Sequence, residues 1–471
     1  MLSPILTIHA VRRLIGRLIA WFSTLVLISG WIGCTAPGAP EDKILIEFWD
    51  FPRLPAVQVW LDNAIRDYMR QHPDVHIEYT RLSWSKGTER LDIAAFAGRP
   101  PDVAGAVMNL KYQQAGLLAP VDRYLDEEIP GTNGTLWRDD IHPAVLRAVQ
   151  WEGQTWAFPW YKEGFVMVLN RDIFAERGVE LPEGGQWTWE EFLEKMTALT
   201  FKRDGVQVYG VGFNTGREKW EAWPFLFAEG MQLISADGRR MLIDSPETRA
   251  GIQRLYDLEH TYRVAMPGAG GYLDDTTWSA FTGKDRRLAA VCQGVWSLKA
   301  VEISNQRRAD AIARDPTAAK DLPPELNIAV ALYPRIPGRP QIMASYGVGS
   351  YMVFNRPHDP RRTEAAARFA RWLTLEVGQR ICREAGVLPS RRSTGNLFAG
   401  DPRYEPLMPY WADSISPPVH PVWNELARII DDQLSLALLG QKSIDEAVRA
   451  MQDRCQIVLD DYWRSADAAV N

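Results

Sequence analysis

The side chains best suited to chemistry in this sequence are aromatic. The chain holds 19 Trp among 471 residues, so many flat apolar rings have to be placed. Packing in the core accounts for most such rings, and it is the alternative reading for each of them. A ring face left open can instead stack on the apolar face of a ligand such as a sugar. Aromatic and proline residues are densest in one short stretch, Trp156, Phe158, Pro159, Trp160 and Tyr161.

No catalytic motif accompanies these rings. The sequence lacks a G-x-S-x-G elbow, an H-E-x-x-H pair and a phosphate-binding glycine loop followed by Lys and Ser or Thr. The seven His residues show no metal-ligand spacing, and the pairs Asp274-Asp275 and Asp460-Asp461 are typical of solvated surface. We expect no enzyme, no metal and no cofactor. Two carboxylates for glycoside cleavage can lie far apart in sequence, so a Trp-rich secreted glycoside hydrolase stays open as an alternative.

Length and composition indicate a soluble globular body. A chain of 471 residues is too long for one ordinary core and suits two domains. The apolar share of 46% and the charged share of 24% are those of a globular protein. A net charge of −6 offers no basic surface for nucleic acid.

The N-terminus has the pattern of a targeting segment. Arg12, Arg13 and Arg17 precede an apolar run from Leu18 to Ile32, and Gly33-Cys34 follows. A cysteine directly after the apolar run resembles the bacterial lipoprotein signal, in which Cys34 would carry the lipid. We predict a signal peptide at residues 1–33 and a lipidated tether at residues 34–43.

An uncleaved membrane anchor is the alternative for this segment, because the apolar run approaches the length that spans a bilayer. Either interpretation places the body of the protein outside the cytoplasmic membrane, in the periplasm or at the cell surface. The three remaining cysteines cannot all pair with one another, and we expect them to be buried free thiols: Cys292, Cys382 and Cys455.

Strand and helix patterns alternate along the chain, which predicts an α/β fold. The stretch from Gly153 to Thr200 is the most informative. Its aromatic cluster is predicted to connect two sheets, and Phe165–Leu169 is predicted to be a buried parallel strand because it is almost continuously apolar. Thr188 with Glu191 three residues later predicts a helix that begins with a capping box.

The order of motifs from Ile44 to about Tyr462 resembles the extracellular solute-binding proteins that serve sugar ABC transporters. The resemblance depends on the ordered set, since no single motif is specific. Its parts are Pro101-Asp102-Val103, Gly116-Leu117-Leu118, Phe158-Pro159, Leu169-Asn170-Arg171-Asp172, Thr188-Trp189-Glu190-Glu191-Phe192, Phe281 with Gly283, Lys284, Gly294 and Trp296, and Gly386 with Pro389 and Arg391.

That resemblance implies a type II periplasmic-binding-protein fold, with two lobes of mixed sheets flanked by helices and a hinged cleft between them. The predicted ranges are residues 44–158 and 336–395 for lobe 1, and residues 159–335 and 396–471 for lobe 2. The implied crossings between lobes lie near residues 157–160, 334–341 and 393–401.

The resemblance also implies a monomer that binds a mono- or oligosaccharide in the cleft and delivers it to an ABC transporter permease. A glycerol phosphate or phosphodiester is the alternative ligand, since Arg391 could hold a phosphate. A lipoprotein that kept the fold and lost transport is a third reading. Asp102 is expected to orient a loop. The expected ligand-binding residues are Trp49, Trp84, Trp160, Tyr161, Trp223, Trp296, Tyr346 and Arg391.

Overall fold

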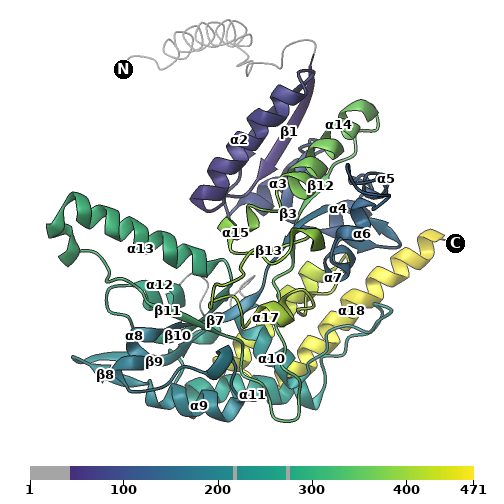
Figure 1. Cartoon of the computed structure of the whole chain (residues 1–471). Helices are drawn as coiled ribbons and strands as arrows, with labels where there is room; N and C mark the ends of the chain where they lie inside the picture. The colour runs from purple at the N-terminus through teal and green to yellow at the C-terminus, as the bar shows by residue number, and fades with distance from the viewer. Residues whose placement is uncertain (1–42, 216–219, 272–275, 471) are drawn as a thin grey trace, which may run out of the picture. The chain divides into compact units, whose positions relative to one another are not determined.

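A computed structural model describes residues 43–215, 220–271 and 276–470 of the chain. Cys34, the predicted signal peptide and the tether up to residue 42 lie outside these ranges, as does the pair Asp274-Asp275. Residues Leu45–Asn471 form one compact unit. Within its described part, strands and helices alternate and make two larger mixed sheets and one two-stranded ribbon (Figure 1). The predicted α/β class is confirmed.

The first sheet has six strands in the order β13-β6-β12-β3-β1-β2 within the described residues. Helix α2 packs against β2, and α14 packs against β12 and β3. Its strands are β1 (Ile44–Asp50), β2 (Val75–Arg81), β3 (Val103–Val107), β6 (Phe158–Lys162), β12 (Val348–Val353) and β13 (Leu388–Pro389).

The second sheet has five strands in the order β11-β7-β10-β9-β8, again within the described part of the chain. A short ribbon pairs β4 (Gln150–Trp151) with β5 (Gln154–Thr155). The strands of the second sheet are β7 (Phe165–Asn170), β8 (Phe201–Arg203), β9 (Val206–Gly212), β10 (Leu288–Gly294) and β11 (Ile328–Ala331).

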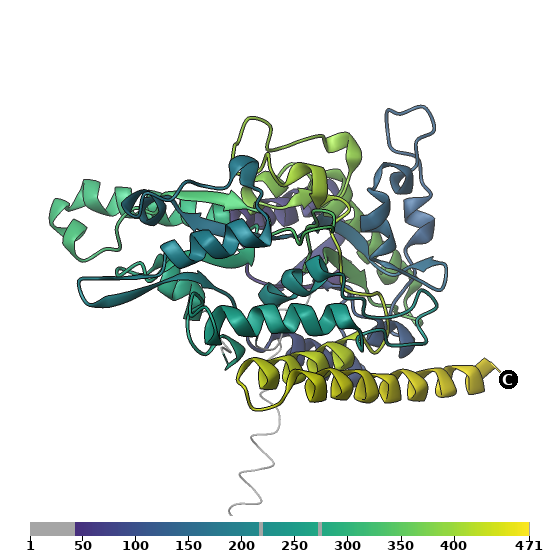
Figure 2. The ribbon, with the colours of Figure 1, turned by 90° about the horizontal axis from the view of Figure 1, so that it is seen from below.

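Helices cover the sheets and complete the cores. In the second half of the chain α11, α17 and α18 lie side by side, as Figure 2 shows in teal and yellow. The helices are α2 (Pro55–Gln71), α3 (Gly87–Phe96), α4 (Leu110–Gln114), α5 (Asp122–Leu125), α6 (Trp137–Asp140), α7 (Pro143–Arg147), α8 (Arg171–Glu176), α9 (Trp189–Ala198), α10 (Trp223–Glu229), α11 (Pro246–His260), α12 (Thr276–Thr282), α13 (Ser297–Arg314), α14 (Pro360–Arg371), α15 (Cys382–Ala385), α16 (Met408–Trp411), α17 (Trp423–Leu438) and α18 (Ile444–Val470).

The run Phe165–Leu169 is buried, as predicted, but it is not a parallel strand. β7 pairs antiparallel with both β10 and β11. Its side chains alternate between two cores, with Met167 and Leu169 in one and Val166 and Val168 in the other. Because both faces of the sheet are covered, every position from Phe165 to Leu169 is apolar whichever way the neighbouring strands run.

The aromatic cluster before β7 is not a connection between sheets. Residues Phe158–Lys162 form β6, which pairs with β12 and β13 inside the first sheet. The chain passes to the second sheet directly afterwards, between Lys162 and Phe165. It returns between the end of β11 at Ala331 and the start of β12 at Val348. The residue ranges of the two lobes stay a prediction.

Several local predictions are confirmed. The side chain of Thr188 accepts a hydrogen bond from the Glu191 N–H, and the Glu191 carboxylate accepts one from the Thr188 N–H, so α9 begins with a capping box. Asp102 is buried and accepts bonds from the Glu47 N–H and from the guanidinium groups of Arg356 and Arg362, which makes it a structural residue. The three predicted thiols are free and buried: Cys292, Cys382 and Cys455.

Candidate functional site

The strand ends that could position a ligand lie together at one edge of the first sheet. β1 runs parallel to β3. β12 is antiparallel to both β3 and β6, so that Gly349 lies opposite Val107 and Val348 lies opposite Lys162. The carboxyl ends of β1, β3 and β6 therefore meet at the edge where β12 begins. Ligands of open α/β sheets bind at such carboxyl ends.

The second sheet has a matching edge. Phe165, the first residue of β7, lies opposite Gly294, the last residue of β10. β10 runs parallel to β9, whose last residue is Gly212. Trp296 lies two residues after the end of β10 at Gly294, so its ring is placed beside this edge.

Two residues, Glu163 and Gly164, join the two edges. The Val295 N–H donates a hydrogen bond to the Gly164 carbonyl at 2.8 Å, and the Phe165 N–H donates to the Ala344 carbonyl at 2.8 Å. Backbone bonds therefore fix the junction where the chain leaves one sheet for the other. The candidate site consists of the side chains around this junction.

A buried polar network lies under Tyr161 on the first edge. Asp50 is fully buried and accepts hydrogen bonds from the Arg53 guanidinium, with one distance of 2.7 Å, and from the Tyr351 hydroxyl at 2.9 Å. Arg53 Nη1 also donates to the Tyr161 hydroxyl oxygen at 2.6 Å. Because Arg53 uses the oxygen as an acceptor, the hydroxyl hydrogen of Tyr161 is available for another acceptor.

Burial raises the pKa of Tyr161 above its ordinary range, and Arg53 offsets only part of that rise. Burial also raises the pKa of Tyr351, and the Asp50 carboxylate adds to the effect. Both phenols therefore stay protonated near neutral pH. Tyr161 is therefore a neutral hydrogen-bond donor. The ion pair of Asp50 and Arg53 holds its hydroxyl oxygen in place.

Glu163 is the most perturbed acid at the junction. Burial raises the pKa of its carboxyl to about 8, against smaller opposing effects of the Gly164 N–H and of Arg53. Its Oε2 atom is buried and has no hydrogen-bond partner among the described residues. A protonated carboxyl with a free oxygen can donate to or accept from a ligand hydroxyl.

The raised pKa of the Glu163 carboxyl predicts how the stability of Glu163→Gln differs from that of the wild type as the pH changes. Between pH about 4.5 and about 8 the folded state keeps a proton that the unfolded state has lost, so wild-type stability falls as the pH rises through this window. Glutamine has no such dependence. We expect urea unfolding to show a stability gain for Glu163→Gln that grows across the window and then levels off.

The control for this experiment is Glu194→Gln, which changes an exposed glutamate of α9. It makes the same change of side chain at an exposed position, and its unfolding is measured over the same pH range. Parallel pH profiles for Glu163→Gln and the wild type would contradict the burial of a protonated carboxyl at this position.

Trp296 offers an open ring on the second edge. Its side chain is 37% exposed, and it precedes α13 as the N-cap residue. The indole lies directly over Gly294, where a Cβ atom would come within 2.5 Å of Nε1. This close approach of the ring to the backbone explains why glycine stands at position 294.

Tyr346 brings a second aromatic pair to the junction. It is half-buried, and its ring centroid lies 4.9 Å from that of Trp220 and 6.2 Å from that of Phe165. Trp220 is also half-buried and donates from Nε1 to Asp431 at 3.3 Å.

Trp49 is the second-last residue of β1, and Trp84 lies in the loop that follows β2. Trp49 is half-buried, with the Arg90 guanidinium 4.7 Å from its ring centroid. Trp84 is 67% exposed and stacks on Phe51. Trp49 thus belongs to the first sheet, Trp84 lies in the loop after one of its strands, and both rings retain exposed surface.

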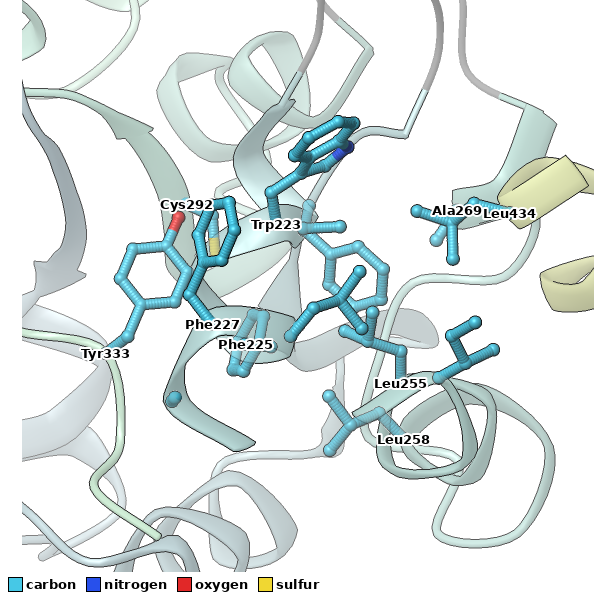
Figure 3. Packing of buried hydrophobic residues seen from close by; sticks show 14 of the residues in the cluster. Trp223, Phe225, Phe227, Leu255, Leu258, Ala269, Cys292, Tyr333 and Leu434 are labelled. Carbon is cyan, nitrogen blue, oxygen red and sulfur yellow. The ribbon is translucent and has the colours of Figure 1, made fainter. Parts of the chain in front are cut away.

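Trp160 and Trp223 are core residues. Trp160 is 1% exposed, lies between Trp60 and Tyr351 at centroid distances of 5.6 and 5.7 Å, and donates from Nε1 to the Gly378 carbonyl at 2.7 Å. Trp223 is 2% exposed and packs in the cluster drawn in Figure 3. The alternative reading of core packing describes these two rings, and neither presents an open face for stacking.

Arg391 is occupied by partners within the protein. Its Nε donates to the Asp140 carboxylate at 2.6 Å, and Nη1 donates to the Leu375 carbonyl at 2.8 Å. The guanidinium also lies 4.8 Å from the ring centroid of Trp137. The guanidinium of Arg391 thus contacts Asp140, Leu375 and Trp137, and these are not the residues that contact Tyr161 or Trp296.

Sequence reasoning did not select three residues of the junction: Arg53, Glu163 and Trp220. The Trp-x-x-Trp spacing of Trp220 and Trp223 was a usable signal, because residues three apart share one helical face. A lone glutamate between the apolar runs of β6 and β7 was another. Arg53 has no local signal, since its role depends on Asp50 and Tyr161 together.

Two mixed sheets linked by crossings of the chain, with open rings and neutral hydrogen-bonding groups at their junction, define a ligand-binding protein of the two-lobed kind. The family comparison agrees with this class. The model of the bacterial extracellular solute-binding proteins matches residues 53–380, which is more than half of the chain. This protein belongs to that family.

Individual relatives are distant. A Brucella abortus protein, named only as a binding protein, is 19% identical over 407 residues, covering 85% of this chain and 90% of the relative. The diacetylchitobiose binding protein of Streptomyces coelicolor is 25% identical over 183 residues, 38% of this chain and 39% of that one. An ABC substrate-binding protein of Listeria monocytogenes, solved with cycloalternan, superposes with a TM-score of 0.69 at 17% identity, covering 89% of this chain and 100% of that one.

The described residues contain neither a membrane-spanning helix nor a cluster of metal ligands. None of the helices there is both long and apolar enough for a membrane span. In the same ranges, His, Cys, Asp and Glu side chains form no group of three or more that could hold a metal ion.

Proposed function

We propose that this protein captures a carbohydrate, a mono- or oligosaccharide, between the facing edges of its two sheets and delivers it to an ABC transporter permease. The observation that carries this proposal is the set of ring faces and neutral hydrogen-bonding groups at the junction. Tyr161 lies on the first edge, and Glu163 lies in the two-residue link between the sheets. Trp296 lies on the second edge, and Tyr346 lies in the segment that returns to the first sheet.

This chemistry suits a sugar. Exposed ring faces stack on the apolar C–H faces of a pyranose, while a neutral phenol and a protonated carboxyl bond its hydroxyl groups. Asp50 and Arg53 near the junction neutralise each other, and the buried Lys162 ammonium is bonded to the carbonyls of Ala412 and Ser414. A micromolar ligand requires about −8 kcal/mol of binding free energy, which a few stacked rings and hydrogen bonds supply.

Transport requires that the ligand change the protein's conformation. We propose that the lobes close over the sugar by hinge motion at the crossings, and that the permease reads the closed form. Only a difference in affinity between the closed and open forms can drive this shift. Residues from both edges must therefore contact the same ligand.

The phosphate alternative is less well supported. It was based on Arg391 as a free guanidinium, and that group is bonded to Asp140 and Leu375. We therefore place the glycerol phosphates in the test as a competing ligand class. A glycoside hydrolase is tested in the same experiment by analysing the sugar after incubation.

The family and the N-terminal pattern together support a location outside the cytoplasmic membrane. We propose that Cys34 is lipidated and that the tether holds the solute-binding body, as a monomer, at the outer side of the cytoplasmic membrane. Mass spectrometry of the mature protein tests this anchoring, since cleavage before Cys34 leaves a lipid-modified N-terminal cysteine.

The experiment that tests the function is a thermal-shift screen of the full chain, purified in a detergent without a sugar head group. The panel holds mono- and oligosaccharides, polyols and glycerol phosphates. A ligand at about a hundred times its dissociation constant adds about 2.7 kcal/mol to stability, a visible rise in Tm. A sugar that raises Tm and is recovered intact supports the proposal, whereas a response to glycerol phosphates alone or cleavage of the sugar would overturn it.

A further inference from the structure

Trp296 lies between two glycines that belong to different parts of the fold. Gly294, the last residue of β10, lies under the indole, where a Cβ atom would come within 2.5 Å of Nε1. Gly386, the residue that ends α15, lies behind the backbone of Trp296, where a Cβ atom would be 3.4 Å from Cα. The ring of Trp296 is therefore placed by its own strand and also by a helix that follows much later in the sequence.

Helix α15 packs beside the first sheet. It contacts α2 and β13, and its first residue, Cys382, lies in the core that contains residues of β1, β3 and α2. Trp296 instead precedes α13, which packs in a core that contains residues of β7 and β10. The contact between Gly386 and Trp296 therefore joins elements of the two sheets at a further place, besides the link between β6 and β7.

Lys299 extends this contact by one helical turn. Residues three apart share a face of a helix, and a Cβ atom at Gly386 would be 3.2 Å from Cγ of the Lys299 stem. The Lys299 ammonium pairs with Glu302 of α13 at 3.0 Å and reaches Glu384 of α15 at 3.7 Å. We call the approach of Glu384 and Gly386 to Trp296 and Lys299 the α15 contact.

Tyr404 closes a further side of Gly386. Its hydroxyl oxygen would be 3.1 Å from a Cβ atom at position 386, and this hydroxyl has no hydrogen-bond partner among the described residues. The Tyr404 ring is fully buried and stacks on Phe398 at a centroid distance of 4.0 Å. Because this hydroxyl, the Lys299 stem and the Trp296 backbone surround one glycine, a side chain at position 386 would have to push at least one of them aside.

We propose that Gly386 is a positioning residue for the sugar site: it lets α15 meet Trp296 and Lys299, and it thereby sets, from the side of the first sheet, where the ring of Trp296 stands on the second edge. Gly386 acts through Trp296 and need not touch the sugar itself. A movement of one sheet relative to the other would then move the stacking surface of this ring. The consequence for sugar binding rests on the proposed function, whereas the placement of the ring can be tested without a sugar.

The test follows the ring of Trp296 by fluorine NMR. The full chain is labelled with 5-fluorotryptophan and purified in detergent, and the signal that is missing from Trp296→Phe is that of Trp296. Gly386→Ala should shift or broaden this signal, because the added Cβ atom displaces groups of the α15 contact. The double variant Gly386→Ala/Tyr404→Phe lacks the hydroxyl nearest to the added atom, and its signal should return part of the way.

Gly116→Ala is the matched control for backbone strain. Both glycines lie just beyond a short helix, with φ of 67° at Gly116 and 70° at Gly386. A Cβ atom at Gly116 would meet nothing within 4 Å, so this variant should leave the Trp296 signal in place. Asparagine tolerates a left-handed backbone better than alanine does, so Gly386→Asn and Gly116→Asn repeat the comparison if alanine at position 386 prevents folding.

An unchanged Trp296 signal in a folded variant of Gly386 would overturn the inference. Equal shifts from the variants of Gly386 and Gly116 would also overturn it, because backbone strain alone would then explain them. Either result would leave the proposed function standing, since no sugar enters the experiment.

Discussion

Replacing Trp160 with alanine is expected to lower the free energy of unfolding by about 3–5 kcal/mol, the range measured for large aromatic side chains removed from cores. The substitution removes the contacts with Trp60 and Tyr351 and leaves the Gly378 carbonyl without its indole donor. Urea unfolding followed by circular dichroism measures the change. Trp160→Phe keeps an aromatic ring in place and should lose much less.

Phe96→Ala is the control for this measurement. Phe96 is an exposed residue of α3, and an exposed ring contributes little to stability. The result matters for function because Trp160 stands next to Tyr161 in the sequence, and both were expected to touch the ligand. A loss of sugar binding by Trp160→Phe with stability unchanged would contradict its placement in the core.

Replacing Trp296 with alanine is expected to weaken sugar binding at least about tenfold, or about 1.4 kcal/mol, while leaving the fold intact. Trp296 keeps an exposed ring face on the second edge, and it contributes no side-chain cap to α13. Its removal therefore takes away stacking surface and costs the core little. Calorimetric titration with the sugar found in the screen measures the effect.

The matched control is Tyr262→Ala, an exposed aromatic residue just beyond α11 in the same half of the chain. Its dissociation constant should equal that of the wild type. An unchanged dissociation constant for Trp296→Ala would remove Trp296 from the site and with it the best-exposed ring of the second edge.

Local features could be predicted from the sequence because their causes are local. The capping box at Thr188 depends on one hydroxyl and one carboxylate three residues apart, and the burial of β7 follows from its own apolar run. The direction of β7 could not be predicted in the same way. A strand covered on both faces is apolar in either direction, so its composition does not reveal how its neighbours run.

Whether an individual aromatic ring is buried or exposed depends on residues far away in sequence. Trp160 is buried by Trp60 and Tyr351, and its indole bonds Gly378, which lies 218 residues away. Both Trp84 and Trp160 were expected to contact the ligand, yet Trp84 is 67% exposed and Trp160 is 1% exposed. Nothing near either residue in the sequence distinguishes the two.

The partners and surroundings of charged groups could not be predicted from the sequence for the same reason. Arg391 was a candidate for a phosphate, yet Asp140, 251 positions earlier, holds its guanidinium. Although burial opposes ionisation of Asp140, hydrogen bonds from Ser393 and Arg391 lower the pKa of its carboxyl. Glu163 was not selected at all, because its raised pKa arises from burial at the junction of two sheets. Such sites become visible only when the sheets are assembled.

The central claim is that one sugar contacts both sheet edges at once, and hydrogen–deuterium exchange tests it most directly. The full chain is compared with and without the sugar that raises its Tm. The account predicts slower exchange in three segments together, residues 48–53, 158–165 and 292–299, with the remote end of α18 unchanged. Protection confined to one sheet, or protection that spares the junction at Glu163 and Gly164, would contradict it.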